Sequence, residues 1–182
     1  MTEPAATALS PGVQGVLDGA RHRLGLRVYF EDTDTAGIVY HARYLAFFER
    51  GRAEYLRAAG IHHGPAWVER DIDTRLGFAV TRCDMEFVRP ARLDDWLEIH
   101  TEVETSRAAS VVVRQCAWRG DTLLVRARIG VAVLDGHGRP RRMPADWRRV
   151  LDQMAVPAET MADDTKRDAR GAAEGPHGED KA

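Results

Sequence analysis

The sequence predicts an α+β fold in which a curled antiparallel sheet wraps around one long central helix. Two observations carry this prediction. Apolar residues follow a helical period from residue 39 to 59, and from Gly77 onward their period is two. Four strands then follow one another without a second long helix between them, which disfavours a parallel doubly wound sheet.

Composition and charge narrow the class of protein. The 182 residues suit one domain with a core, and 44% hydrophobic with 30% charged residues is ordinary for a globular chain. The net charge of -2 provides no basic field for nucleic acid. No stretch reaches the length of a membrane helix, and the start lacks a signal-peptide pattern. Cys83 and Cys116 are expected to be buried thiols, so we expect a cytoplasmic protein.

The elements are expected in the following order. Residues 1–23 are small and polar and residues 157–182 are charged, so both ends are expected to be disordered around a folded domain of residues 24–156. Residues 26–30 look like a strand. The helix of residues 39–59 is apolar on most sides, which predicts burial, and Gly60 is expected to cap its C-terminus. Four strands and a short helix at residues 144–154 complete the domain.

The segment "EDTDTAGIVYH" at residues 31–41 concentrates the polar residues that suggest chemistry. It places Asp32, Asp34 and His41 at the start of an apolar helix, with Gly37 between them. A buried helix needs no histidine in its first turn. The segment therefore calls for a functional interpretation as well as a structural one.

A metal site, a phosphotransfer loop and a helix cap would each account for part of this segment. The two aspartates could bind a divalent metal with nearby histidines, but no further ligand has a suitable spacing, so we expect no metal. A D-x-D-x-T phosphotransfer loop is disfavoured by Ala36 at its fifth position and by the missing parallel sheet. A helix cap by Asp34 or Thr35 is the simplest structural interpretation, but it does not account for Gly37 and His41.

An acyl-transfer site uses every part of the segment. Free backbone N–H groups at the helix start would stabilise charge on a carbonyl oxygen, and Gly37 would let a substrate approach the backbone. Asp34 would be the nucleophile or the general base for water, and His41 would hold the carbonyl, a water or the leaving group. The free amides are expected near Ile38, Val39 and Tyr40, and those from Val39 to His41 are expected to bind the carbonyl oxygen.

The string "RVYFEDTDTAGIVYHARYLAFFERGRAEYLRAAG" strongly resembles the YbgC-like branch of the acyl-CoA thioesterases, a hotdog family related to 4-hydroxybenzoyl-CoA thioesterase. "RPARLDDWLEI" resembles a later segment of that family, and the resemblance covers about residues 24–150. It implies that Asp34 is the essential aspartate and that His41 and Gly37 match the family's histidine and glycine. Many members have tyrosine where this chain has Phe30, whose ring is expected to line the pocket.

The resemblance also implies assembly and partners. It implies an acyl-CoA substrate, a homodimer or homotetramer with active sites at the subunit interface, and acyl carrier protein as a further partner. No cofactor is expected. Two rival functions remain: another hotdog activity such as an acyl thioester dehydratase, whose different motif is not found, and a module that binds acyl-CoA or acyl carrier protein without turnover. Asp34 argues against the second, because an extra anion does not help to bind an anionic ligand.

Several residues outside this segment have both a structural and a functional interpretation. Glu49 is expected to pair with Arg50 or Arg52 at the surface; the alternative is a polar contact that lines the site or the dimer interface. Arg89, Arg92 and residues 138–142 suit the phosphates of coenzyme A, although a solvated surface is the simpler interpretation. His62 and His63 are expected in an exposed loop. Trp67 and Phe78 are expected in the core, with an acyl pocket as the alternative.

Overall fold

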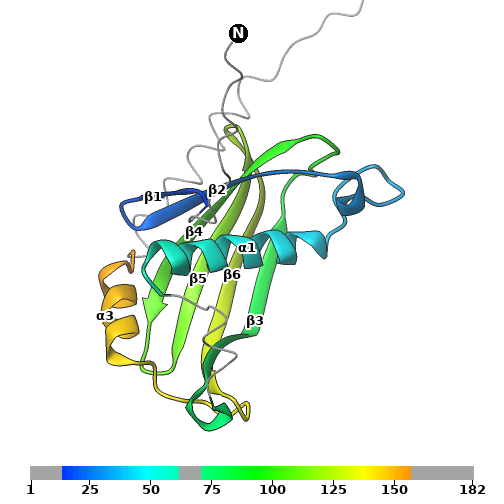
Figure 1. Ribbon diagram of the computed structural model, residues 1–182. Coiled ribbons are helices and arrows are strands. Elements are labelled where there is room, and N and C mark those ends of the chain that lie inside the picture. The colour runs from blue at the N-terminus through cyan, green and yellow to red at the C-terminus, as the bar shows by residue number, and fades with distance from the viewer. Residues whose placement is uncertain (1–13, 62–70, 157–182) are drawn as a thin grey trace, which may run out of the picture.

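The computed structural model describes residues 14–61 and 71–156, which form one antiparallel sheet with a helix across it (Figure 1). The strand order is β1-β2-β4-β5-β6-β3. The strands are β1 (Val16–Asp18), β2 (Arg21–Arg27), β3 (Leu76–Phe87), β4 (Trp96–Ser106), β5 (Ser110–Arg119) and β6 (Thr122–Asp135). The helices are α1 (Arg43–Ala58) and α3 (Ala145–Gln153), with 3-10 turns η1 (Phe30–Asp32) and η2 (Ile72–Thr74). The predicted hotdog arrangement is confirmed.

The boundaries near the N-terminus differ from the prediction. The first long strand is β2, whose inward residues are His22, Leu24 and Leu26, instead of residues 26–30. β1 and the first three residues of β2 lie before the predicted domain start at residue 24. The polar His22 at an inward position and the uncharged Gly25 at an outward one weaken this alternation in a hydropathy pattern. Helix α1 begins four residues later than predicted, because residues 39–42 form extended backbone and a turn. Residues 1–13 and 157–182, predicted to be disordered, lie outside the described residues.

Helix α1 ends as its sequence predicts. Gly60 has a positive φ of 76°, a conformation that costs a residue with a Cβ atom about 1–2 kcal/mol. Its N–H donates to Arg57 O at 3.0 Å, and the Ile61 N–H donates to Leu56 O at 2.8 Å. These two bonds are a Schellman motif, which satisfies carbonyls that the helix end leaves open.

The helix lies close to the sheet at Gly51. A Cβ atom there would be 2.8 Å from Ile99 Cγ2, 2.9 Å from Thr101 Oγ1 and 3.0 Å from Gln115 Nε2. Gln115 is buried, and its Nε2 donates to Phe48 O and to Thr101 Oγ1, both at 2.8 Å. The amide of Gln115 thus ties a carbonyl of α1 to β4 and β5.

Strand β3 is a long edge of the sheet and has no neighbouring strand on its outer side among the described residues. All of its twelve residues are exposed or only partly buried, including Val80 at 50% exposure and Phe87 at 51%. Cys83 is exposed, so the prediction of a buried thiol there is wrong, and Cys116 on β5 is only partly buried. Cys83 belongs to the expected apolar face of β3, but α1 packs over β2 and β4 and leaves this part of β3 uncovered in the single chain.

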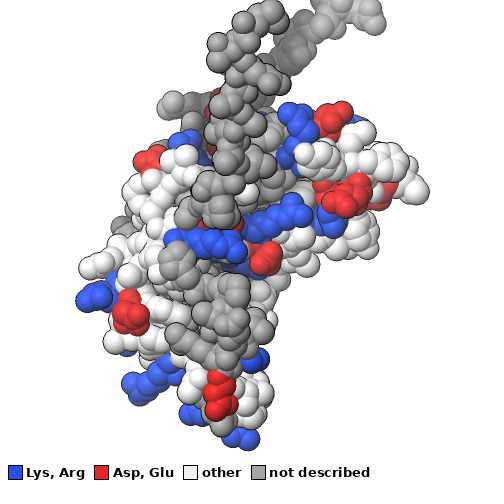
Figure 2. All heavy atoms as spheres, in the orientation of Figure 1, with Lys and Arg blue, Asp and Glu red and all other residues white. Residues whose placement is uncertain are grey.

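Charges of both signs are interspersed over the surface. In Figure 2 basic and acidic side chains alternate across the visible face of the described residues. Arg126 on β6 pairs with Glu86 on the neighbouring strand β3, and Arg128 on β6 reaches across β5 to pair with Glu104 on β4. The visible face therefore has no broad basic patch of the kind that binds a nucleic-acid backbone. No helix within the described residues is long and apolar enough to cross a bilayer.

Gly51→Ala tests the close approach of helix and sheet. Helix propensity alone would stabilise this variant by about 1 kcal/mol. We expect the opposite, a loss of about 1–2 kcal/mol in the free energy of unfolding, because the added methyl group overlaps three side-chain atoms. Urea unfolding measures the difference. A stabilised variant would show that the helix moves away from the sheet without cost.

Candidate active site

The loop between β2 and α1 is held by the carboxylate of Asp32. Asp32 is 2% exposed, and its Oδ2 accepts the Tyr29 N–H at 2.8 Å. Its Oδ1 accepts from Nε of Arg43 at 2.7 Å and also from the terminal nitrogen NH2 of that guanidinium. This contact raises the pKa of Arg43, the first residue of α1. The ion pair joins the start of the loop to the start of the helix.

Asp34 lies on a tight turn that this loop presents. The Asp34 N–H donates to Ile38 O at 2.9 Å, and the Gly37 N–H donates to Asp34 O at 3.0 Å. Gly37 has a φ of 71°, and a Cβ atom there would meet nothing within 4 Å. The glycine is therefore required by its backbone conformation. The side chain of Asp34 is exposed, and its Oδ1 accepts the Ala36 N–H at 2.8 Å.

The backbone amides before α1 are used differently from the prediction. The Val39 N–H donates to Ala91 O and the Tyr40 N–H donates to Asp32 O, both at 2.9 Å. These two amides cannot bind a carbonyl oxygen without giving up a bond. Neither they nor Ile38 belong to the helix, which begins at Arg43. Within the described residues, the N–H groups of Ile38 and His41 have no backbone acceptor; His41 lies two residues before the helix, so its amide is the one nearest the helix start that is open to a ligand.

Asp34 and His41 line one open pocket of about 360 Å³. Its walls combine the loop, the first turn of α1 and the segment that follows β3. Arg89, predicted as a phosphate contact, lies at this pocket, whereas Arg92 does not line it. The lining residues are Asp34, Ile38, Val39, His41, Tyr44, Phe87, Val88, Arg89 and Pro90.

Aromatic contacts position His41, and burial with a hydrogen bond positions Tyr44. The His41 ring lies 4.3 Å from the Tyr40 ring centroid and 6.5 Å from that of Phe87. Tyr44 is 2% exposed, and its hydroxyl oxygen accepts the Ala91 N–H at 3.2 Å. Burial raises the pKa of Tyr44, so this phenol stays protonated at neutral pH. It retains a proton to donate, in the wall of the pocket.

The side chains of three predicted substrate-contacting residues lie elsewhere; for Tyr40 the predicted contact was its backbone amide. Phe30 is 81% exposed in the 3-10 turn and does not line the pocket, contrary to the prediction. Tyr40 is 45% exposed and packs against His41 outside the pocket. Glu49 is two turns along α1 and lines a different cavity together with Arg52. The predicted ion pair of Glu49 does not form among the described residues.

Sequence reasoning missed the far wall of the pocket. Phe87, Val88 and Pro90 come from the end of β3, some fifty residues after the loop. Only strand pairing brings them there: the Ile38–Arg92 bridge joins the loop to the segment after β3. The one sequence signal for this wall is the adjacent "RPARL" string, whose residues alone do not indicate what they face. His62, His63 and Trp67 lie outside the described residues.

No metal cluster accompanies the site. In residues 14–61 and 71–156, no three His, Cys, Asp or Glu side chains are grouped as metal ligands would be. Asp32, a candidate ligand by sequence, points to Arg43 and Tyr29.

Two variants distinguish the contribution of the Asp32–Arg43 pair to stability from that of the exposed Glu31 beside it. Asp32→Asn should lower the free energy of unfolding by about 1–3 kcal/mol, because a hydrogen-bonded, nearly buried charge is lost. Glu31→Gln removes the exposed carboxylate that contacts the same Arg43 at 3.2 Å and should cost less than about 0.5 kcal/mol. Thermal unfolding of both variants measures the contrast. Equal losses would contradict the special role of Asp32.

Comparison with known proteins places this fold and site in a family. The thioesterase superfamily matches residues 36–126. The acyl-CoA thioester hydrolase YbgC of Escherichia coli O6:H1 is 41% identical over 124 residues, 67% of this chain and 89% of the relative. The acyl-CoA thioesterase YbgC of Haemophilus influenzae is 38% identical over 130 residues, 71% of this chain and 93% of the relative.

Solved structures agree with the sequence relatives. A probable thioesterase from Bartonella henselae is 39% identical and superposes with a TM-score of 0.64, covering 68% of this chain and 99% of that protein. A 4-hydroxybenzoyl-CoA thioesterase variant, in complex with 4-hydroxybenzoyl-CoA, is 25% identical with a TM-score of 0.64 and covers 73% and 99%. Family, relatives and fold coincide: this chain belongs to the thioesterase superfamily and is a thioester hydrolase.

Proposed function

We propose that this protein hydrolyses acyl-CoA to a free acid and coenzyme A, with Asp34 as the group that acts on the thioester. The observation that carries the proposal is the pocket: an exposed carboxylate and the open amide of His41 belong to one loop, beside apolar walls. The relatives named as acyl-CoA thioesterases support the substrate class.

The proposed geometry assigns a role to each polar group. The thioester oxygen accepts the His41 N–H at the start of α1, where the helix dipole also favours negative charge. The acyl group packs against Phe87, Val88 and Pro90. The imidazole of His41, at the mouth of the pocket, donates to the substrate or to a water.

Asp34 acts in one of two ways, both of which conserve atoms and charge. As a general base it takes a proton from water, and the oxygen of that water attacks the thioester carbon. As a nucleophile it forms an anhydride that water then cleaves. In both cases the C–S bond breaks, the thiolate of coenzyme A leaves and takes up a proton, and the acyl group leaves as an acid.

Two alternative functions make different demands on Asp34. A module that binds acyl-CoA or acyl carrier protein without turnover gains nothing from a carboxylate beside an anionic ligand. An acyl thioester dehydratase would act on the acyl chain and leave the thioester intact. Acyl carrier protein could also replace coenzyme A as the carrier of the same acyl group.

We also propose a homodimer, formed through the outer edge of β3. An unpaired edge of twelve residues with exposed Val80 and Phe87 offers backbone N–H and C=O groups to a second strand. Antiparallel pairing of two β3 strands around a twofold axis would place the start of one beside the end of the other. The Asp34 pocket, which borders the end of β3, would then be closed by the second copy.

Asp34→Asn tests the proposed chemistry. Turnover of a panel of acyl-CoAs, from short aliphatic to aromatic, should fall at least about 100-fold, the usual effect of removing a catalytic base. Asp94→Asn is the matched control: it removes an exposed carboxylate on another loop, and asparagine tolerates the positive φ of 65° there. Thiol release measures the rate.

The same panel decides between the functions. Equal thiol release by wild type and Asp34→Asn would overturn the role of Asp34. No release by the wild type with any acyl-CoA or acyl carrier protein, while ligands still bind, would leave the binding module. Loss of water from a 3-hydroxyacyl thioester, without thiol release, would identify a dehydratase.

Val80→Lys tests the dimer. A charge on the exposed edge of β3 should convert the dimer to a monomer, because lysine on an edge strand opposes pairing. Val16→Lys is the control on the opposite edge, where β1 has only three residues and Val16 is 58% exposed. Light scattering after gel filtration gives the mass. A monomeric wild type, or a dimer that survives Val80→Lys, would contradict this interface.

A further inference from the structure

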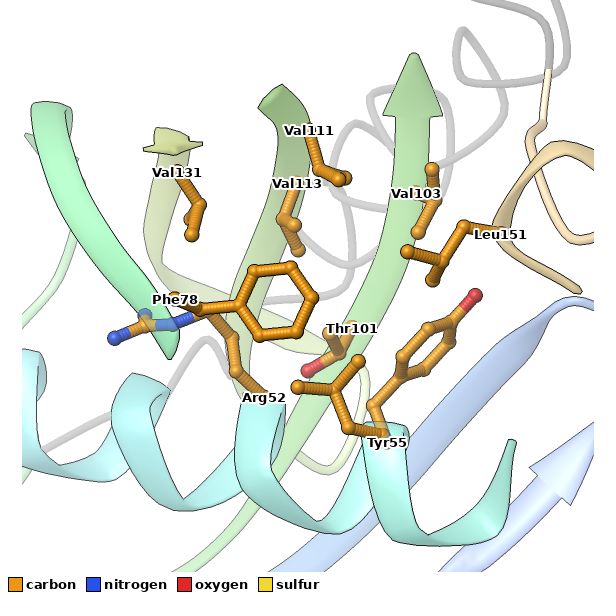
Figure 3. A pocket seen from close by; sticks show the side chains of 10 residues that line it. Arg52, Tyr55, Phe78, Thr101, Val103, Val111, Val113, Val131 and Leu151 are labelled. Carbon is orange, nitrogen blue, oxygen red and sulfur yellow. The ribbon is translucent and has the colours of Figure 1, made fainter. Parts of the chain in front are cut away.

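A second cavity lies between the C-terminal half of α1 and the sheet, away from Asp34. Figure 3 shows Phe78, Val113 and Val131 projecting from the strands into this space, with Arg52 and Tyr55 rising from α1. Its inner chamber measures about 60 Å³ and is lined mostly by aliphatic side chains and Phe78. It shares no lining residue with the pocket of Asp34 and His41.

An outer chamber of about 400 Å³ adjoins it and opens toward solvent. Arg52, Leu56, Phe78 and Val131 line both chambers, so the guanidinium of Arg52 lies where the two meet. Glu49 lines only the outer chamber, one turn before Arg52 on α1. The cavity is thus apolar inside, with a cation at its entrance.

Arg52 is held in place but its charge is not paired. NH1 of Arg52 donates to Gln115 Oε1 at 2.8 Å, and Gln115 is itself fixed by Phe48 O and Thr101 Oγ1. No carboxylate of the described residues makes an ion pair with Arg52; Glu49 acts on it only through its field. Burial lowers the pKa of Arg52, which reflects the cost of keeping this charge among apolar groups.

A half-buried guanidinium with one neutral partner retains four N–H donors in a planar fork, the geometry that binds a carboxylate. The inner chamber has room for roughly four to six groups the size of a water or a methylene. We propose that this cavity binds a short-chain carboxylate, with its anion on Arg52 and its aliphatic tail in the inner chamber.

Within one chain the proposal is separate from the hydrolysis at Asp34, since it concerns binding by residues of another cavity; the proposed dimer would bring this cavity beside the Asp34 pocket of the second copy. The proposed ligand is nevertheless related to the reaction, because a carboxylic acid is the product class of thioester hydrolysis. A short free acid held there would mark a second site for the released product. Binding is measured without turnover, so the two proposals fail separately.

Calorimetric titration with hexanoate and with hexanamide tests the charge. The full-length protein should bind hexanoate at least about tenfold more tightly than hexanamide, which has the same tail and no charge. Arg52→Met should abolish this difference, while circular dichroism checks that the variant is folded. Equal affinities for the two ligands in the wild type would overturn the proposal.

Glu49→Gln is a second variant, and we expect it to raise the affinity for hexanoate, whereas Arg52→Met lowers it. Removing the anion beside the cavity mouth should strengthen hexanoate binding severalfold and leave hexanamide unchanged, because Glu49 then no longer competes for Arg52. A purely structural role of Glu49 and Arg52 predicts no such gain. Weaker or unchanged hexanoate binding in Glu49→Gln would count against the assignment.

Methyl NMR locates the ligand. Hexanoate should shift the methyl resonances of Val113, Val131 and Leu151, which line the inner chamber, and leave those of Val39 and Val88 at the Asp34 pocket unchanged. Shifts confined to Val39 and Val88 would place the carboxylate in the catalytic pocket and overturn the proposal.

Discussion

The candidate active site depends on the ion pair between Asp32 and Arg43. A loop that leaves a strand and enters a helix has many conformations, and folding must offset the loss of that freedom. Asp32 accepts from the backbone of Tyr29 and from the guanidinium at the first residue of α1. This one nearly buried carboxylate joins both ends of the loop. It thereby fixes the position of the turn that carries Asp34, and of the open amide of His41, at the pocket. A site that must stabilise charge in a transition state requires such preorganisation.

The contact between helix and sheet also depends on one buried polar side chain. Gly51 removes the side chain that would separate α1 from Ile99 and Thr101, and Gln115 uses the resulting proximity to bond to Phe48 O. The same amide orients Arg52 into a cavity lined by aliphatic residues. Gln115 therefore bonds both to the backbone of α1 and to the unpaired guanidinium of Arg52. A contact that packs helix against sheet thus also fixes the cation of the proposed binding site. Buried polar groups of this kind stabilise a fold only when they are hydrogen-bonded, and Gln115 meets that condition.

The open edge of β3 links fold and activity. Its exposed apolar residues and its uncovered Cys83 lie between the two cavities, one at each end of the strand. A second copy paired along this edge would cover both cavities at once. The proposed dimer and the proposed site of hydrolysis are therefore linked through this edge.

The sequence by itself determined the fold class, the long helix followed by four strands, the cap at Gly60 and the loop that carries Asp34 and His41, because these follow from local periodicity, turn chemistry and a long motif. It did not determine where α1 begins, since the Val39 and Tyr40 amides bond to Ala91 and Asp32 instead of starting a helix. It selected Asp34 over Asp32 as the reactive group, but it did not show that Asp32 is buried and bonded to Tyr29 and Arg43. Partners such as Arg43, Phe87 and Gln115 come from distant segments, and only tertiary packing brings them together. Which carboxylate is buried and which faces a ligand is decided by those partners.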